Sequence, residues 1–161
     1  MSVTDELLQN NQRYAFPGAL PVPPARQVAV VACMDARLNP YGILGLREGD
    51  AHIIRNAGGV VTEDVIRSLL ISQRLLGTRE VILIHHTECG MLSFKDDAVK
   101  AQIEAETGLR PPFALEAFPD LDGDVKQSID RIKASPFIAH KESVRGFVYD
   151  VQSGRLREVA T

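Results

Sequence analysis

Three side chains capable of metal or acid–base chemistry alternate in the stretch Cys33-Met34-Asp35-Ala36-Arg37. A thiolate binds soft metals, a carboxylate accepts protons or binds metal, and a guanidinium forms bidentate pairs with carboxylates. In an extended backbone the alternation places Cys33, Asp35 and Arg37 on one side. The only other cysteine of the chain lies in a second polar stretch, His86-Thr87-Glu88-Cys89-Gly90. The two stretches therefore contain both thiols of the protein.

Two thiolates and one imidazole, from Cys33, Cys89 and His86, make a tetrahedral zinc site with one position left for water or substrate. A closed structural site would need a fourth ligand, and the chain has no third cysteine. The pattern therefore predicts a catalytic zinc site, with one ion per chain. Asp35 could hydrogen-bond a water ligand or bind the metal itself, and Arg37 could hold Asp35 away from the metal.

Each part of this pattern has a simpler interpretation when it is taken alone. A buried cysteine such as Cys33 is often only a small apolar side chain, and two cysteines could form one disulfide. Asp35 and Arg37 could be an exposed ion pair worth less than about 1 kcal/mol. The combination favours zinc, because the residues that flank both cysteines suit a metal site.

Both polar stretches follow apolar runs that indicate buried strands, 28–32 and 80–85. In open parallel α/β sheets, ligands bind beyond the carboxyl ends of the strands. The remaining pattern predicts strands at 51–56 and 144–151, and helices at 3–15, 40–46, 62–76, 92–106 and 120–133. A short edge strand at 155–159 should be antiparallel, and 113–118 is ambiguous. We expect an α/β fold with a mostly parallel sheet of about four strands, this edge strand, and helices on both faces.

The domain organisation has two parts. We expect residues 1–24 to form a helix on a proline-rich extended arm, and residues 25–161 to form a single α/β zinc-binding catalytic domain. The helix has too thin an apolar side for a core of its own, so we expect it to dock on another subunit. The alternative is that it folds back on its own sheet.

Composition excludes several classes of function. A net charge of −3 gives no basic surface for nucleic acid. No apolar run reaches the roughly 20 residues of a membrane helix, so a membrane is not an expected partner. The first residues lack the basic and apolar regions of a signal peptide. We therefore expect a cytoplasmic protein, in which thiols stay reduced and available to metal.

With these motifs in place, the sequence resembles the β-class carbonic anhydrases. The resemblance rests on Cys-x-Asp-x-Arg at 33–37, His-x-x-Cys-Gly at 86–90, Arg-Asn-Ala-Gly-Gly at 55–59 and the strand at 146–150. It covers nearly the whole chain, and the length matches a short branch of the family that also includes carbonyl sulfide hydrolases.

The resemblance implies a lyase that hydrates carbon dioxide reversibly to bicarbonate, with zinc-bound hydroxide oriented by Asp35 and Arg37. It also implies that the Gly90 N–H donates to a substrate oxygen, and that the N-terminal helix packs on a neighbouring subunit in a homodimer or tetramer. Family members with a bicarbonate-closed form have tryptophan and glycine where this chain has Val30 and Ala32. We therefore expect Asp35 to pair with Arg37 and not with zinc.

Two histidines outside the zinc set have separate interpretations. Histidine titrates near neutral pH, so His52 is a candidate proton shuttle. It could instead be a strand-end or interface histidine. His85 should point away from His86 on its strand and have a structural role.

Two other functions remain open from the sequence. The same zinc hydroxide could hydrolyse carbonyl sulfide or carbon disulfide, and the motif does not separate these reactions from hydration of carbon dioxide. A non-catalytic zinc protein is a third possibility, but such a protein would have no use for the Asp35 and Arg37 pair.

Overall fold

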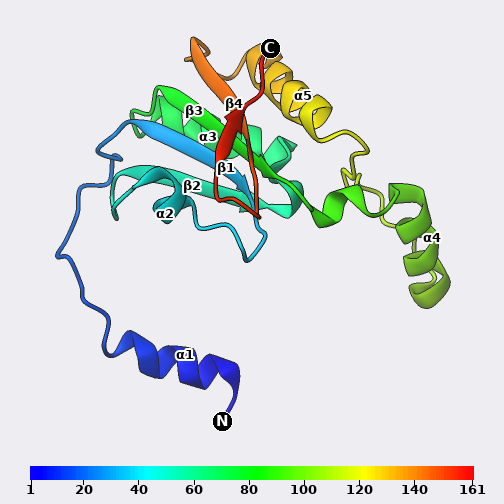
Figure 1. Ribbon diagram of the computed structural model, residues 1–161, viewed down its shortest axis with the longest axis horizontal. Helices are drawn as coiled ribbons and strands as arrows, with labels where there is room; N and C mark the ends of the chain where they lie inside the picture. The colour runs from blue at the N-terminus through cyan, green and yellow to red at the C-terminus, as the bar shows by residue number, and fades with distance from the viewer.

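The computed structural model describes residues 1–161 and is built on a five-stranded sheet with the order β2-β1-β3-β4-β5 (Figure 1). The strands are β1 (Val28–Cys33), β2 (Ala51–Asn56), β3 (Glu80–His86), β4 (Ser143–Tyr149) and β5 (Leu156–Glu158). Strands β1 to β4 are parallel to one another, and β5 is antiparallel to β4. The predicted α/β fold, with four parallel strands and an antiparallel edge strand, is confirmed.

Five α-helices lie near their predicted positions. They are α1 (Val3–Asn11), α2 (Pro40–Leu44), α3 (Glu63–Arg74), α4 (Asp96–Thr107) and α5 (Leu121–Ala134). Helix α1 is shorter than predicted, and the ambiguous residues 113–118 form neither helix nor strand. None of these helices has the length and apolar composition that a membrane span requires.

Helices α3 and α5 cover one face of the sheet and enclose the larger core. The Thr62 hydroxyl caps α3 by accepting from the Val65 N–H, and acidic residues occupy the first helical turn. Leu69 of α3 and Ile129 of α5 are completely or almost completely buried against the strands. The opposite face is covered mainly by the short helix α2 and nearby loops, and residues such as Ile53 and Ile82 stay partly exposed there.

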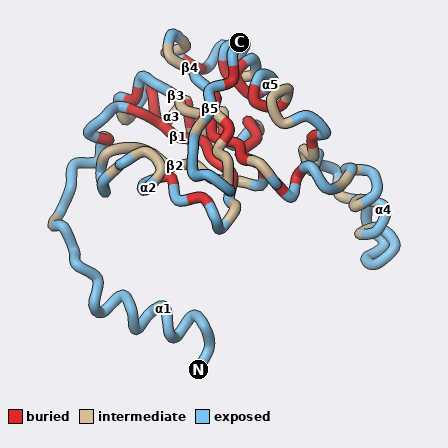
Figure 2. The backbone as a smooth tube through the Cα atoms, viewed as in Figure 1, coloured by how far each residue is buried: buried red, intermediate tan, exposed pale blue.

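Helix α1 lies away from the sheet at the end of its extended arm (Figures 1 and 2). It has no buried residue, and the side chains of Leu7 and Leu8 are 61% and 63% exposed. The N-terminal helix therefore does not fold back on its own sheet.

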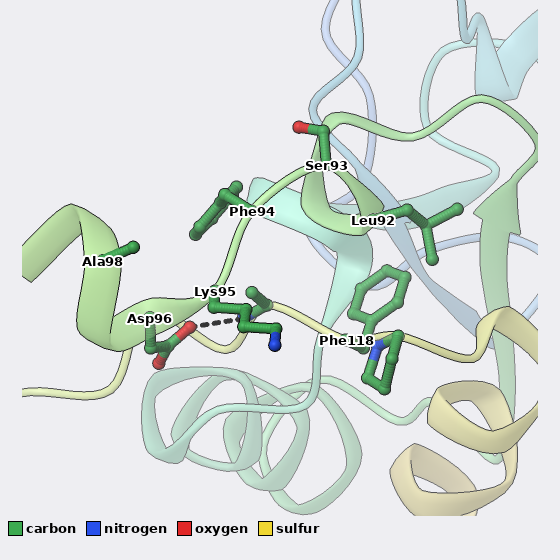
Figure 3. A pocket seen from close by; sticks show the side chains of 9 residues that line it. Leu92, Ser93, Phe94, Lys95, Asp96, Ala98 and Phe118 are labelled. Atoms are coloured by element: carbon green, nitrogen blue, oxygen red, sulfur yellow. Dashed lines mark hydrogen bonds between the residues drawn. The ribbon is translucent and has the colours of Figure 1, made fainter.

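Helix α4 projects from the other side of the domain and also has no buried residue (Figures 1 and 2). At its base the Asp96 carboxylate accepts from the main-chain N–H groups of Leu115, Glu116 and Ala117, at 2.8 to 3.1 Å. Figure 3 shows this base beside a cavity of about 520 Å³. The cavity is lined by Leu92, Ser93, Phe94, Lys95, Asp96, Ala98, Ala117, Phe118 and Pro119. One carboxylate therefore ties the returning chain to the start of α4.

We predict that Asp96→Asn loosens this connection. A hydrogen bond to a charged group is worth about 1.5–3 kcal/mol, so exchange of the amide hydrogens at Leu115 and Ala117 should accelerate at least about tenfold. Hydrogen-exchange mass spectrometry of native protein would measure it. Asp97→Asn is the matched control, because the Asp97 side chain is 94% exposed and pairs with Arg110. Equal exchange in the two variants would contradict the role of Asp96.

Candidate metal centre

The three predicted metal ligands meet at the carboxyl ends of two neighbouring strands. Strands β1 and β3 are parallel and paired up to Ala32 and Ile84, so Cys33 lies one residue, and His86 two residues, beyond the last pair. Cys89 follows three residues after His86. The ligand atoms of all three residues lie within 4.8 Å of one another, and all three residues are buried. The structure thus brings together the set that the sequence predicted.

The His86 ring is oriented for metal binding. Its Nδ1 lies 2.8 Å from the Thr87 carbonyl oxygen, an acceptor, so Nδ1 carries the hydrogen. The Nε2 lone pair is then free, and Nε2 is buried without a hydrogen-bond partner. Buried polar atoms are nearly always partnered, and metal-binding histidines typically donate from their other nitrogen. The orphaned Nε2 beside two thiols fits a zinc ion, which prefers this donor set.

The contact between the two thiols favours ionisation of Cys33 and opposes ionisation of Cys89. The hydrogen bond from Cys89 lowers the pKa of Cys33 to about 4, with further help from the main-chain N–H groups of Asp35 and Gly58. The same contact raises the pKa of Cys89, because loss of its proton would place two thiolates together. Loss of the Cys33 proton is therefore favoured over loss of the Cys89 proton.

Asp35 is fixed beside this group by Arg37. Asp35 Oδ1 accepts from the Arg37 main-chain N–H at 2.8 Å and from its Nε at 3.0 Å, and Oδ2 accepts from Nη2 at 2.8 Å. The expected pairing of Asp35 with Arg37 is thus present. Asp35 Oδ2 also lies 3.6 Å from Nε2 of His86, so one carboxylate oxygen faces the ligand set.

The Arg37 hydrogen bonds hold the pKa of the Asp35 carboxyl far below its usual range. The carboxylate is therefore ionised throughout the neutral range. The stability that this pair contributes is present above about pH 3.9, the pKa of an unfolded aspartate, and is lost as pH falls through the lower folded value.

Arg37 also joins the two polar loops, a contact that the sequence did not indicate. Its Nη2 donates to the Glu88 carbonyl oxygen at 3.0 Å. Glu88 has a φ of 54°, which is uncommon for a residue other than glycine. The Glu88 carboxylate accepts in turn from Nε2 of Gln152 at 2.9 Å. The β4–β5 turn therefore supports the loop between His86 and Cys89.

Gly59 lets the glycine loop approach the end of β1. It has a φ of 67°, and a Cβ at this position would lie 2.9 Å from the Cys33 nitrogen. The Asn56 side chain donates to the Val60 carbonyl at 2.8 Å and closes the loop. The loop therefore packs directly against the main chain at Cys33, and a side chain at position 59 would not fit there.

The remaining predicted site residues have different positions. Gly90 opens a 3₁₀ turn directly after Cys89, and no atom lies within 4 Å of the place that its Cβ would occupy. His52 does not join the site of its own chain. It pairs with Ala29, about 13 Å before Cys33 along the strands at 3.3 Å per residue. Its Nδ1 forms a hydrogen bond of 2.7 Å with the Ser72 hydroxyl of α3, on the face of the sheet that α3 covers.

His85 has the structural position that alternation along β3 predicted. Its Nε2 lies 2.7 Å from Oδ2 of Asp124, and both side chains are buried. The ring also packs 5.4 Å from the ring of Phe118. His85 therefore connects β3 to α5 while His86 faces the metal site.

The fold and this site define an α/β protein with a cysteine–histidine–cysteine group, of the kind that could hold a metal ion, at the carboxyl edge of a parallel sheet. Comparison with known families gives the same class: the family model described as carbonic anhydrase matches residues 28–110. The chain belongs to the β-class carbonic anhydrase family.

Known proteins of two activities resemble the chain over its whole length. It is 60% identical to β-carbonic anhydrase 1 of Mycobacterium tuberculosis, with 99% of each chain covered. A crystal structure of carbonic anhydrase from Streptococcus mutans matches with a TM-score of 0.93 and 41% identity, over 99% of each chain. Carbon disulfide hydrolase of Acidithiobacillus thiooxidans is 33% identical, over 98% of this chain and 90% of that protein.

We predict that Gly59→Ala displaces Cys33 and weakens metal binding. The new methyl group would contact main-chain atoms that have little freedom to move, and overpacking of this kind costs about 1–3 kcal/mol. Competition with a chromogenic chelator would measure zinc affinity, which should fall about tenfold. Gly77→Ala is the control, because Gly77 has a φ of 81° but open space around it. Equal losses of affinity would mean that backbone strain alone is responsible.

Proposed function

We propose that the protein is a zinc-dependent carbonic anhydrase that interconverts carbon dioxide and bicarbonate. One observation carries the proposal. The unpartnered Nε2 of His86 points at two thiols, and Asp35, held by Arg37, lies 3.6 Å from it. The similarity to β-carbonic anhydrase 1 over the full chain supports the same activity.

In this proposal Cys33, His86 and Cys89 hold one zinc ion in each chain. When bound, zinc supplies hydroxide at neutral pH by lowering the pKa of a water ligand. The contact from the His86 Nδ1–H to the Thr87 carbonyl fixes the tautomer that zinc binding needs. Because its pKa is low, the Cys33 thiol would lose its proton readily when it binds zinc.

Asp35 orients the nucleophile, and Arg37 keeps Asp35 in position. Arg37 contributes one hydrogen bond to Oδ2 of Asp35, and a carboxylate oxygen can accept two. The remaining lone pair of Oδ2 can accept the hydrogen of the attacking oxygen and direct its own lone pair to the substrate carbon. Because both oxygens of Asp35 are bonded to Arg37, we expect the carboxylate to stay off the metal.

Carbon dioxide offers little hydrogen bonding, so an apolar approach to the metal suits it. Val60, Met91 and Phe118 are buried in one cluster with the two cysteines. In the proposed mechanism the N–H of Gly90 donates to a substrate oxygen in the open space beside that residue. His52 has no role within its own site, and its role as a proton shuttle remains a prediction that this placement does not favour.

Substitution of Asp35 tests the mechanism. We expect Asp35→Asn to lower kcat/KM for carbon dioxide hydration at least about 100-fold, because the amide loses the charged pair with Arg37 that orients the acceptor oxygen toward the nucleophile. Its zinc content should remain one ion per chain, because Asp35 is not a ligand. Stopped-flow hydration with a pH indicator, together with metal analysis, measures both quantities.

Asp64→Asn is the matched control, since Asp64 is exposed and pairs with Arg67 one turn away. Its hydration activity should equal that of the parent protein. A zinc-loaded parent protein without hydration activity would instead support the non-catalytic interpretation.

Hydrolysis of carbonyl sulfide or carbon disulfide is the second candidate. The similarity to a carbon disulfide hydrolase over 98% of the chain favours it, and the same nucleophile would attack the same carbon. Sulfide release from both substrates should be measured on the sample used for hydration. We expect kcat/KM for hydration to be the larger, and the reverse order would assign the protein to the hydrolases.

We propose that two copies form a homodimer, or a dimer of dimers, through the N-terminal helix. Helix α1 has no buried residue, and contact with a second copy would bury the exposed apolar side chains of Leu7 and Leu8. The thinly covered face of the sheet, with partly exposed Ile53 and Ile82, is an apolar surface of the kind that such a helix could cover.

We expect the double substitution Leu7→Asp/Leu8→Asp to shift the assembly toward a 17.7 kDa monomer. Burial of two charges against an apolar face is unfavourable by several kcal/mol. Light scattering coupled to size-exclusion chromatography would measure the mass. Asn10→Asp/Asn11→Asp adds the same charge to the same helix without removing apolar surface, and should leave the mass unchanged. A monomeric parent protein would refute the proposal.

A further inference from the structure

Arg55 makes three hydrogen bonds to main-chain oxygens of the metal-site loop. Its Nε and Nη2 donate to the Cys33 carbonyl at 3.0 and 2.8 Å, and Nη2 also donates to the Asp35 carbonyl at 2.8 Å. Arg55 stands at the end of β2, one residue before Asn56, which pairs with Cys33. One guanidinium therefore binds the main chain of Cys33, a proposed metal ligand, and the main chain of Asp35, the group proposed to orient the nucleophile.

This contact differs from most other arginine contacts of the chain, although Arg74 also donates only to a main-chain carbonyl, that of Phe137, at 2.8 Å. Arg37, Arg145 and Arg157 each pair with a carboxylate. Arg55 forms no ion pair, although it is exposed and charged. Its fork is used entirely on carbonyl oxygens, a geometry that the planar guanidinium provides and an ammonium group does not.

The contact lies where strand pairing ends. The ladder between β1 and β3 stops at Ala32, and the ladder to β2 stops at Cys33. Beyond it, the Met34 N–H still bonds the Asn56 carbonyl at 2.7 Å. The carbonyls of Cys33 and Asp35 lie beyond the paired strands, and Arg55 is the side chain that binds both of them. The Asp35 carbonyl also accepts from the Leu38 N–H at 3.0 Å, so Arg55 adds a link between the two peptides to this local turn. The orientation of these peptides sets the direction of both side chains.

We propose that Arg55 is a positioning residue, which fixes the spacing between the Cys33 sulfur and the Asp35 carboxylate through their main-chain carbonyls. The inference rests on the proposed function, because it takes Cys33 as a zinc ligand and Asp35 as the group that orients the nucleophile. Arg37 acts on the Asp35 side chain, and Arg55 acts on the backbone that carries it.

Arg55→Lys and Arg55→Ala test the inference in the full-length, zinc-loaded protein. Lysine keeps the charge but loses the fork. Loss of a group that orients a metal ligand typically costs about 10- to 100-fold in metal affinity or activity, so we expect zinc release to a chromogenic chelator to accelerate by about that factor. The kcat for hydration should fall by a similar factor with little change in KM, because the residue does not contact substrate. The visible spectrum of the cobalt-substituted protein should change in band position or intensity.

Arg131→Lys is the matched control. Arg131 of α5 also donates to a main-chain carbonyl, that of Val61, at 2.9 Å, but outside the site. Its zinc release, kcat and cobalt spectrum should match those of the parent protein. Thermal unfolding of all variants separates a general loss of stability from a local effect on the site.

The outcomes separate this inference from the proposed function. If the parent protein binds zinc and hydrates carbon dioxide, but both Arg55 variants keep parental zinc release, kcat and cobalt spectrum, the positioning role is wrong. It is also wrong if the Arg55 and Arg131 variants change zinc release equally. If the parent protein binds no zinc or shows no hydration activity, the proposed function fails first. Faster zinc release with an unchanged melting temperature in Arg55→Lys supports the inference.

Discussion

The site depends on the parallel pairing of β1 and β3. Adjacent strands lie about 4.8 Å apart, and the two loops that leave their carboxyl ends start from that separation. All six residues of β1 are buried, so a shift of register by one residue would place each side chain on the wrong face of the sheet. Packing of the sheet thus fixes the distance between Cys33 and His86 before any metal binds.

Beyond the last strand pair, contacts of side chains, and no longer the hydrogen bonds between strands, hold the loops of the site in place. Arg37 joins Asp35 to the Glu88 carbonyl, and Gly59 lets its loop press against Cys33. Exposed ion pairs contribute little to stability, typically less than about 1 kcal/mol. The value of the Asp35–Arg37 pair therefore lies in geometry: it holds one carboxylate oxygen toward the His86 ring. Stability comes from the apolar core, and precision at the site comes from a few polar contacts to main-chain atoms.

The sequence predicted features that depend on local patterns. Apolar runs located the strands. Two of these runs are followed directly by rare residue types, which identified Cys33, His86 and Cys89 as candidate metal ligands. The sequence could not show contacts between distant positions. Arg55 belongs to the motif at 55–59 that is visible in the sequence, but only the sheet shows that its side chain binds the Cys33 carbonyl. Gln73 interrupts the apolar side of α3 in the sequence, and only the fold shows that it binds the main chain at His140. His52 suggested a shuttle by residue type, but the strand register places it far from the metal ligands.

The uneven cover of the sheet bears on the assembly. Mostly parallel sheets usually have both faces buried, yet here α3 and α5 cover one face while the other has only α2 and loops. Helix α1, which has apolar residues and no core, is held away from its own domain by a proline-rich arm. In a twofold dimer each copy could supply the helix that the other lacks, because such contacts are reciprocal. The partly exposed Ile53 and Ile82 would then be buried fully only in the pair, so that stability would depend on protein concentration.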